Sequence, residues 1–262
     1  MDVQQTYVAG WKQAVDAVVE LARELTPEQL AAPTDCPGWS AHDVIAHLAH
    51  LEEVTNGEPE EGVAGAVLVS DYTEAGVAAR RDVPTTELID SLERETARRH
   101  AFLVDADLDL SQPAPVTPGG VAWTWDTLLR NRVIDAWCHE QDVRRAVGHP
   151  GGLDSVGAHV VTHTFAAGLG FVLGKRAQAT PGTTVRWNVT GPVTLDVALT
   201  VGDDGRARPA DPDVEPTATL TMTTEEFTVL GAGRRSPEQL DVTVEGDANL
   251  ARRVLSAMAL TP

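Results

Sequence analysis

The sequence predicts an α plus α+β protein, with a helical bundle over residues 1–178 and a small α+β domain over residues 179–262. Apolar residues recur at helical spacing through most of the first part, whereas short runs of alternating apolar and polar residues fill the second. The chain has 262 residues, 42% hydrophobic and 23% charged, which is typical of a globular protein that buries a core.

The first helices are predicted from apolar spacing and capping residues. An apolar face between Tyr7 and Leu25 predicts a long first helix. A new helix start follows, with Thr26 as N-cap, Pro27 in the first helical position and Gln29 completing a capping box.

Further helices follow the Pro33 and Pro37-Gly38 breaks. Ser40 caps the next one, with Asp43 at its capping-box position. Residues 57–62 are expected to form a loop. Later helices are expected at 72–79, 85–103, 124–147 and 154–173, with a Pro- and Gly-rich connector at 107–121 and a Gly148–Pro150 stop.

Alternating runs predict strands in the last part of the chain, at 183–189, 193–201, 218–222 and 240–244. Helices are expected at 224–230 and 248–260. We expect a small sheet with the helices packed on one face.

Charge and composition exclude several classes of function. Lys and Arg number 20 against 39 Asp and Glu, giving a net charge of −19. Nucleic acids and anionic membranes both require positive charge from their partners, so neither is expected as a ligand. The basic residues are almost all arginine, which is typical of a GC-rich genome such as that of an actinobacterium.

The compartment is expected to be the cytoplasm. Met1 is not followed by a basic and apolar leader, and apolar runs such as 63–69 fall far short of the ~20 residues that span a bilayer. Two cysteines, Cys36 and Cys138, are too few for a disulfide framework, so both are expected to be reduced.

One helix carries a candidate metal site. Asp135 and His139 are four residues apart and therefore project from one helix face, beside core-type Ile134 and Trp137. Burying both is costly unless they are paired or bind a metal. His47, within an apolar run, supplies a third ligand. Two histidines and one carboxylate leave a coordination position open, as in catalytic zinc sites.

The residues alone leave alternatives open. Asp135 and His139 could form only a hydrogen-bonded pair, with His47 a satisfied core histidine. His159 and His163 are also four apart, but no carboxylate lies in register with them. His50, one turn from His47, could line the same pocket, although it is expected to face solvent. Cys36 is expected to have a structural role in a turn.

Three blocks of the chain carry a family resemblance: residues 25–48 with the run Cys36-Pro37-Gly38-Trp39-Ser40, residues 132–148 with the run His139-Glu140-Gln141-Asp142, and residues 230–251. They resemble the actinobacterial mycothiol-dependent maleylpyruvate isomerase family. That resemblance implies a DinB-like metal-binding four-helix bundle followed by a sterol-carrier-like domain.

The resemblance also implies a ligand set. His47 and His139 match the family's two histidines, and Asp135 stands where the family usually has Glu, with a side chain shorter by one methylene. Zinc, or another divalent ion, is the implied metal. Asp142, one turn beyond His139, is the implied acceptor for an imidazole N–H.

The implied chemistry is that of a thiol cosubstrate. The metal lowers the pKa of the mycothiol thiol, and the thiolate attacks a small electrophile, either isomerising maleylpyruvate or transferring the sulfur. No side-chain nucleophile is needed. Arg80, Arg81 and Arg234 are candidates for binding carboxylates, and the second domain is expected to close over the pocket. The alternatives are a binding or regulatory module with a degenerate metal site, and a metal-dependent hydrolase.

Overall fold

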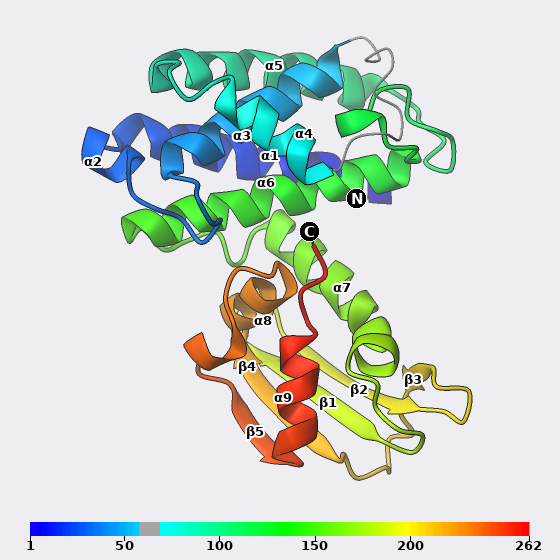
Figure 1. Ribbon diagram of the computed structural model, residues 1–262. Helices are drawn as coiled ribbons and strands as arrows, with labels where there is room; N and C mark the ends of the chain where they lie inside the picture. Colours follow the sequence, from blue (N-terminus) through cyan, green and yellow to red (C-terminus); the bar gives the residue numbers. More distant parts are fainter. Residues whose placement is uncertain (58–68, 262) are drawn as a thin grey trace. The chain divides into compact units, whose positions relative to one another are not determined.

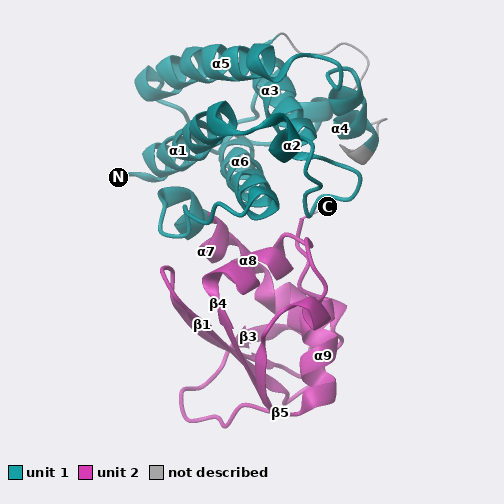
Figure 2. Ribbon diagram, turned by 90° about the vertical axis from the view of Figure 1, so that its left-hand side faces the viewer, with its two compact units in different colours: residues 1–160 teal, residues 161–262 magenta. Residues whose placement is uncertain are grey.

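The computed structural model describes residues 1–57 and 69–261, and it forms two compact units, residues 1–160 and 161–262 (Figure 2). The expected loop at 57–62 and the apolar run at 63–69 lie almost entirely outside the described residues. The units divide inside a helix. The boundary that the sequence predicts, between residues 178 and 179, stays a prediction.

The first unit is built on a four-helix bundle. α1 and α3 each pack against both α5 and α6, so the four helices enclose one core (Figure 1). Their bounds are α1 Val3–Glu24, α3 Ala41–Asn56, α5 Thr85–Asp105 and α6 Trp125–Val147. The predicted helical bundle is confirmed.

Shorter elements join these helices: α2 Pro27–Leu30, α4 Val69–Ala78, which packs on α3, and the 3-10 turn η1 Pro118–Gly120.

Helix ends form where the sequence places them. Thr26 and Ser40 both close capping boxes. α6 ends at Gly148, whose φ of 67° is left-handed and whose N–H donates to the carbonyls of Arg144 and Arg145. Ser40 and Gly148 thereby fix the start of α3 and the end of α6, the two helices that carry the candidate ligands.

α7 Val156–Phe171 continues into a π-helical turn, η2 Val172–Arg176. The combined segment, Val156–Arg176, is long and apolar enough to cross a bilayer, but half of its apolar 18-residue window is buried within the protein. A core helix of a water-soluble protein has the same properties.

The second unit is a five-stranded sheet with helices. The strand order is β3-β2-β1-β4-β5; β1 and β4 are parallel and the other neighbours antiparallel. The strands are β1 Thr184–Thr190, β2 Leu195–Val201, β3 Ala207–Pro209, β4 Ala218–Thr223 and β5 Thr243–Gly246. α8 Thr224–Gly231 packs on β1 and β4, and α9 Ala248–Ser256 packs on β4 and β5 (Figure 1).

The main differences from the prediction in the second unit are three. β3 was not predicted, because its three residues are too few to show an alternating pattern. The last strand follows the 3-10 turn η3 Pro237–Gln239 and begins at Thr243 rather than at residue 240, because its pairing with β4 begins at Thr243. The last helix ends at Ser256, short of the predicted residue 260.

Candidate metal centre

α3 and α6 bring the three predicted ligands together. His47 Nε2 lies 3.0 Å from Asp135 Oδ1, and His139 Nε2 lies 3.6 Å from the same oxygen. One ligand atom from each residue falls within 4.8 Å of the others. The side chain of Asp135 is 25% exposed, whereas His47 and His139 are buried, so solvent reaches the cluster at the carboxylate.

A tight turn places Trp39 over the two histidines. Cys36-Pro37-Gly38-Trp39 forms a β-turn in which the Trp39 N–H donates to the Cys36 carbonyl, and Gly38 adopts φ +82°. The Trp39 ring lies 5.1 Å from the His47 ring and 5.9 Å from the His139 ring, centroid to centroid. The indole therefore covers one side of the imidazole pair.

The carboxylate of Asp135 is ionised. Burial raises its pKa, but the hydrogen bond with His47 and the charge of Arg132 outweigh burial and hold the pKa well below its ordinary value. Burial also lowers the pKa of His47, although Asp135 opposes that shift. A neutral imidazole beside a carboxylate is the protonation state that binds a metal.

His139 lies between two carboxylates. Its Nδ1 is 3.0 Å from Asp142 Oδ2, while its Nε2 faces Asp135. Burial alone lowers the pKa of His139, but the hydrogen bond with Asp142, the contact with Cys36 and the charge of Asp135 raise it to about 10. Without a metal, the ring is therefore an imidazolium shared by the two acids.

Cys36 and Asp142 form a second cluster on the far side of His139. The Cys36 thiol donates to Asp142 Oδ2 at 3.1 Å, and Sγ lies 3.9 Å from His139 Nδ1. Arg145 donates to Asp142 Oδ1 and to Asp35 Oδ2, each at 2.6 Å. Cys36, His139 and Asp142 could also hold an ion. Asp142, however, already forms hydrogen bonds with Cys36, His139 and Arg145, so the cluster is better suited to orienting the His139 ring.

The buried ion pair of Arg132 and Glu52 lies next to Asp135. Arg132 Nη1 donates to Asp135 Oδ2 at 2.8 Å, and Arg132 Nη2 donates to Glu52 Oε1 at 2.6 Å. Trp11 Nε1 donates to the same Glu52 oxygen at 2.8 Å. Sequence reasoning missed Arg132, Glu52 and the position of Cys36. Only the i,i+3 spacing of Arg132 to Asp135 gave a local signal.

Two other predicted residues, Arg80 and Arg81, lie elsewhere in the first unit. Arg80 donates to Glu53 and to the Gly76 carbonyl. Arg81 donates to Asp43 at 3.2 Å and to Glu74 at 2.8 Å. Because carboxylates of the chain already engage both guanidinium groups, their role in binding substrate stays a prediction.

Two expectations about histidines are settled by burial. The prediction that His50 faces solvent is wrong: its ring packs under α4, where a Cβ on Gly76 would lie 2.0 Å from it. Burial, with the charge of Arg80, lowers the pKa of His50 to about 4. His159 and His163 are exposed on α7 and belong to no candidate metal group among the described residues.

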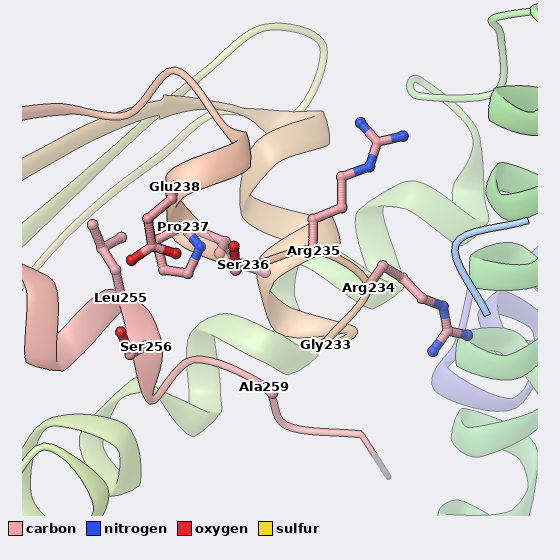
Figure 3. A pocket seen from close by; sticks show the side chains of 10 residues that line it. Gly233, Arg234, Arg235, Ser236, Pro237, Glu238, Leu255, Ser256 and Ala259 are labelled. Carbon is pink, nitrogen blue, oxygen red and sulfur yellow. The ribbon is translucent and has the colours of Figure 1, made fainter. Parts of the chain in front are cut away.

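Arg234 lines a pocket of the second unit. This hollow, of about 370 Å³, lies between the end of α8, η3 and the end of α9 (Figure 3). Figure 3 shows the guanidinium groups of Arg234 and Arg235 extending away from Glu238 and Ser256. The Arg234 Nη1 donates to the Ala232 carbonyl at 3.1 Å.

Comparison with known families decides what the chain is. The family model described as the mycothiol maleylpyruvate isomerase N-terminal domain matches residues 11–144, and the corresponding C-terminal domain model matches residues 155–253. The chain belongs to the mycothiol maleylpyruvate isomerase family. The resemblance seen in the sequence is therefore confirmed, and with it the expectation of an enzyme.

Solved structures agree with the family assignment at the level of the fold. The crystal structure of a mycothiol-dependent maleylpyruvate isomerase matches with a TM-score of 0.60 and 15% identity over 95% of each chain. A histidine-to-alanine variant of a mycothiol-dependent maleylpyruvate isomerase matches with a TM-score of 0.59 and 14% identity over the same shares. No curated protein matches the sequence.

Proposed function

We propose that this member of the mycothiol maleylpyruvate isomerase family is a divalent-metal-dependent enzyme that uses the thiol of mycothiol to attack a small electrophile. The observation that supports this most directly is the convergence of His47 Nε2, Asp135 Oδ1 and His139 Nε2 from two helices. Two imidazoles and one carboxylate form the donor set of a catalytic zinc site, with a position left for an outside ligand.

Residues of the chain would hold the ion, orient its ligands and exclude water. His47, Asp135 and His139 would hold the ion, and Asp142 would accept the Nδ1 proton of His139, which leaves Nε2 as the donor atom. Trp39 would shield the two rings from water. A divalent ion held there would lower the pKa of a bound thiol so that a thiolate forms near neutral pH.

Two reactions follow from one thiolate adduct. The sulfur adds to one carbon of an electrophilic double bond, the bond to the next carbon becomes single and rotates, and loss of the thiolate restores the double bond in the other geometry. This isomerisation is named in the related solved structures. If a proton is added to the adduct instead, the sulfur stays attached and the enzyme acts as a mycothiol S-transferase.

Arg80, Arg81 and Arg234 are proposed to bind carboxylates of the substrate or of mycothiol, although Arg80 and Arg81 would first have to leave their present partners. A cytoplasmic location is proposed, because a reducing compartment keeps both the cosubstrate and Cys36 as thiols.

Metal content tests the proposal. Elemental analysis of purified wild type should give a stoichiometric divalent ion, and His139→Ala should lose it. His149→Ala, at an exposed position just beyond α6, is the matched control and should retain the ion. Retention of metal by His139→Ala would contradict the proposed site.

Thiol dependence separates the proposed activity from its alternatives. The metal-loaded protein should convert maleylpyruvate, or a model electrophile, only when mycothiol is present. Formation of a hydrolysis product without any thiol would instead identify a metal-dependent hydrolase. Absence of metal even after reconstitution would favour a binding or regulatory module.

A further inference from the structure

The two oxygens of Asp135 have different partners. Oδ1 faces His47 and His139, at 3.0 and 3.6 Å from their Nε2 atoms. Oδ2 accepts a hydrogen bond from Arg132 Nη1 at 2.8 Å. A carboxylate that is free to turn can give both oxygens to one metal ion, but here one of them is already committed.

The buried carboxylate of Glu52 holds Arg132 in place. Its side chain is 3% exposed, and its Nη2 donates to Glu52 Oε1 at 2.6 Å, where Glu52 is fully buried. The planar guanidinium can hold two carboxylates at once in a set geometry, which a lysine ammonium cannot do. Trp11 Nε1, at 2.8 Å from the same oxygen, holds Glu52 in turn.

Stability alone does not account for this arrangement. A buried ion pair offsets its desolvation cost only when additional hydrogen bonds satisfy the remaining polar atoms. Within residues 1–57 and 69–261, Arg132 Nε and Glu52 Oε2 are buried with no hydrogen-bond partner. Glu52 also balances the charge of Arg132, so the pair adds little net charge around Asp135. Its main effect is therefore on the geometry of Asp135.

We propose that Arg132 is a positioning residue that limits Asp135 to one ligating oxygen, Oδ1, and that Glu52 anchors Arg132 for this purpose. The inference rests on the proposed function, because it assumes an ion at this site. Its consequence is specificity: with Oδ2 withheld, Asp135 cannot fill the position that the thiol sulfur needs.

The test uses the full-length protein loaded with Co²⁺, whose visible absorption distinguishes four-coordinate from five-coordinate sites. The variants are Arg132→Gln, Arg132→Lys and Glu52→Gln. Arg130→Gln is the matched control, because Arg130 lies on the same helix, is partly exposed and forms an ion pair with Asp126, away from the candidate site. Circular dichroism establishes which variants fold.

We expect wild type and Arg130→Gln to give the intense bands of a four-coordinate ion and to bind 2-mercaptoethanol with a sulfur-to-cobalt band. Arg132→Gln should show the weaker bands of a five-coordinate ion and bind the thiol about tenfold or more less tightly. Arg132→Lys, which keeps the buried charge, and Glu52→Gln should shift the same way, so the test does not depend on one variant folding.

The outcomes separate the two proposals. If every folded Arg132 and Glu52 variant keeps the wild-type spectrum and thiol affinity, the positioning role is wrong while the metal site stands. If wild type takes up no Co²⁺, the proposed function fails and this inference fails with it.

Discussion

The two units of this protein bury different kinds of side chain. In the first unit, α3, α5 and α6 bury charged and ionisable groups; those at or behind the candidate site are His47, Glu52, Arg99, Arg132, His139 and Asp142. In the described part of the second unit, the buried polar residues are the threonines Thr162, Thr184, Thr224 and Thr228. Its sheet is packed with apolar side chains such as Trp187 and Leu220.

The difference indicates that the first unit buries charged groups at a cost in stability. The second unit holds its sheet and helices together with an interior that is mainly apolar. Burying a charge is costly unless it is paired, so a cluster of buried charges on two facing helices is a candidate functional site. The first unit has such a cluster around His139, whose ring makes a hydrogen bond with Asp142 on one side and an ion pair with Asp135 on the other.

The largest change in the free energy of unfolding is expected when an apolar side chain is removed from the second unit. Trp187→Ala deletes a fully buried indole from the central strand and should lower the free energy of unfolding by about 3–5 kcal/mol. Chemical denaturation measures this. Metal affinity under native conditions should not change, and a loss of affinity in the folded variant would contradict the separation of roles between the units.

The next effect concerns the far side of His139. Asp142→Asn removes the charge that holds Nδ1 and should weaken metal binding by about 10–100-fold, as chelator competition would measure. Asp126→Asn, near the start of the same helix and outside the cluster, is the control. Equal affinity in the two variants would mean that Asp142 serves only the fold.

pH should affect the metal-free and metal-loaded proteins in opposite directions. The folded-state pKa of His139, about 10, lies above its ordinary value of 6.5, so its contribution to stability is complete below pH 6.5 and is lost as pH rises through 10. Metal uptake displaces that proton, so affinity should rise roughly tenfold per pH unit between about 7 and 9. Thermal melts and metal titrations across this range measure both slopes. Slopes of the same sign would contradict the exchange of proton for metal.

The smallest effect concerns an exposed charge of the second unit. Arg186 donates to both oxygens of Asp196 on the open sheet face, but solvent surrounds the pair. Arg186→Ala should therefore leave the denaturation midpoint almost unchanged. A shift as large as that of Trp187→Ala would show that exposed charge matters to this unit as much as its apolar core does.

The sequence by itself determined the local structure and the family. Capping residues such as Thr26, Ser40 and Gly148 set helix ends, because their hydrogen bonds reach only three or four residues along the chain. The spacing of Asp135 and His139 placed them on one helix face for the same reason. Alternating runs located four of the five strands.

Tertiary structure decided the contacts between distant segments. Glu52 against Arg132, Cys36 against Asp142 and the burial of His50 under α4 each join residues from different helices or turns, with no periodic pattern to announce them. The short strand β3 likewise exists through its pairing with β2. Such contacts depend on how helices and strands pack, and packing is a property of the whole fold rather than of any local stretch of sequence.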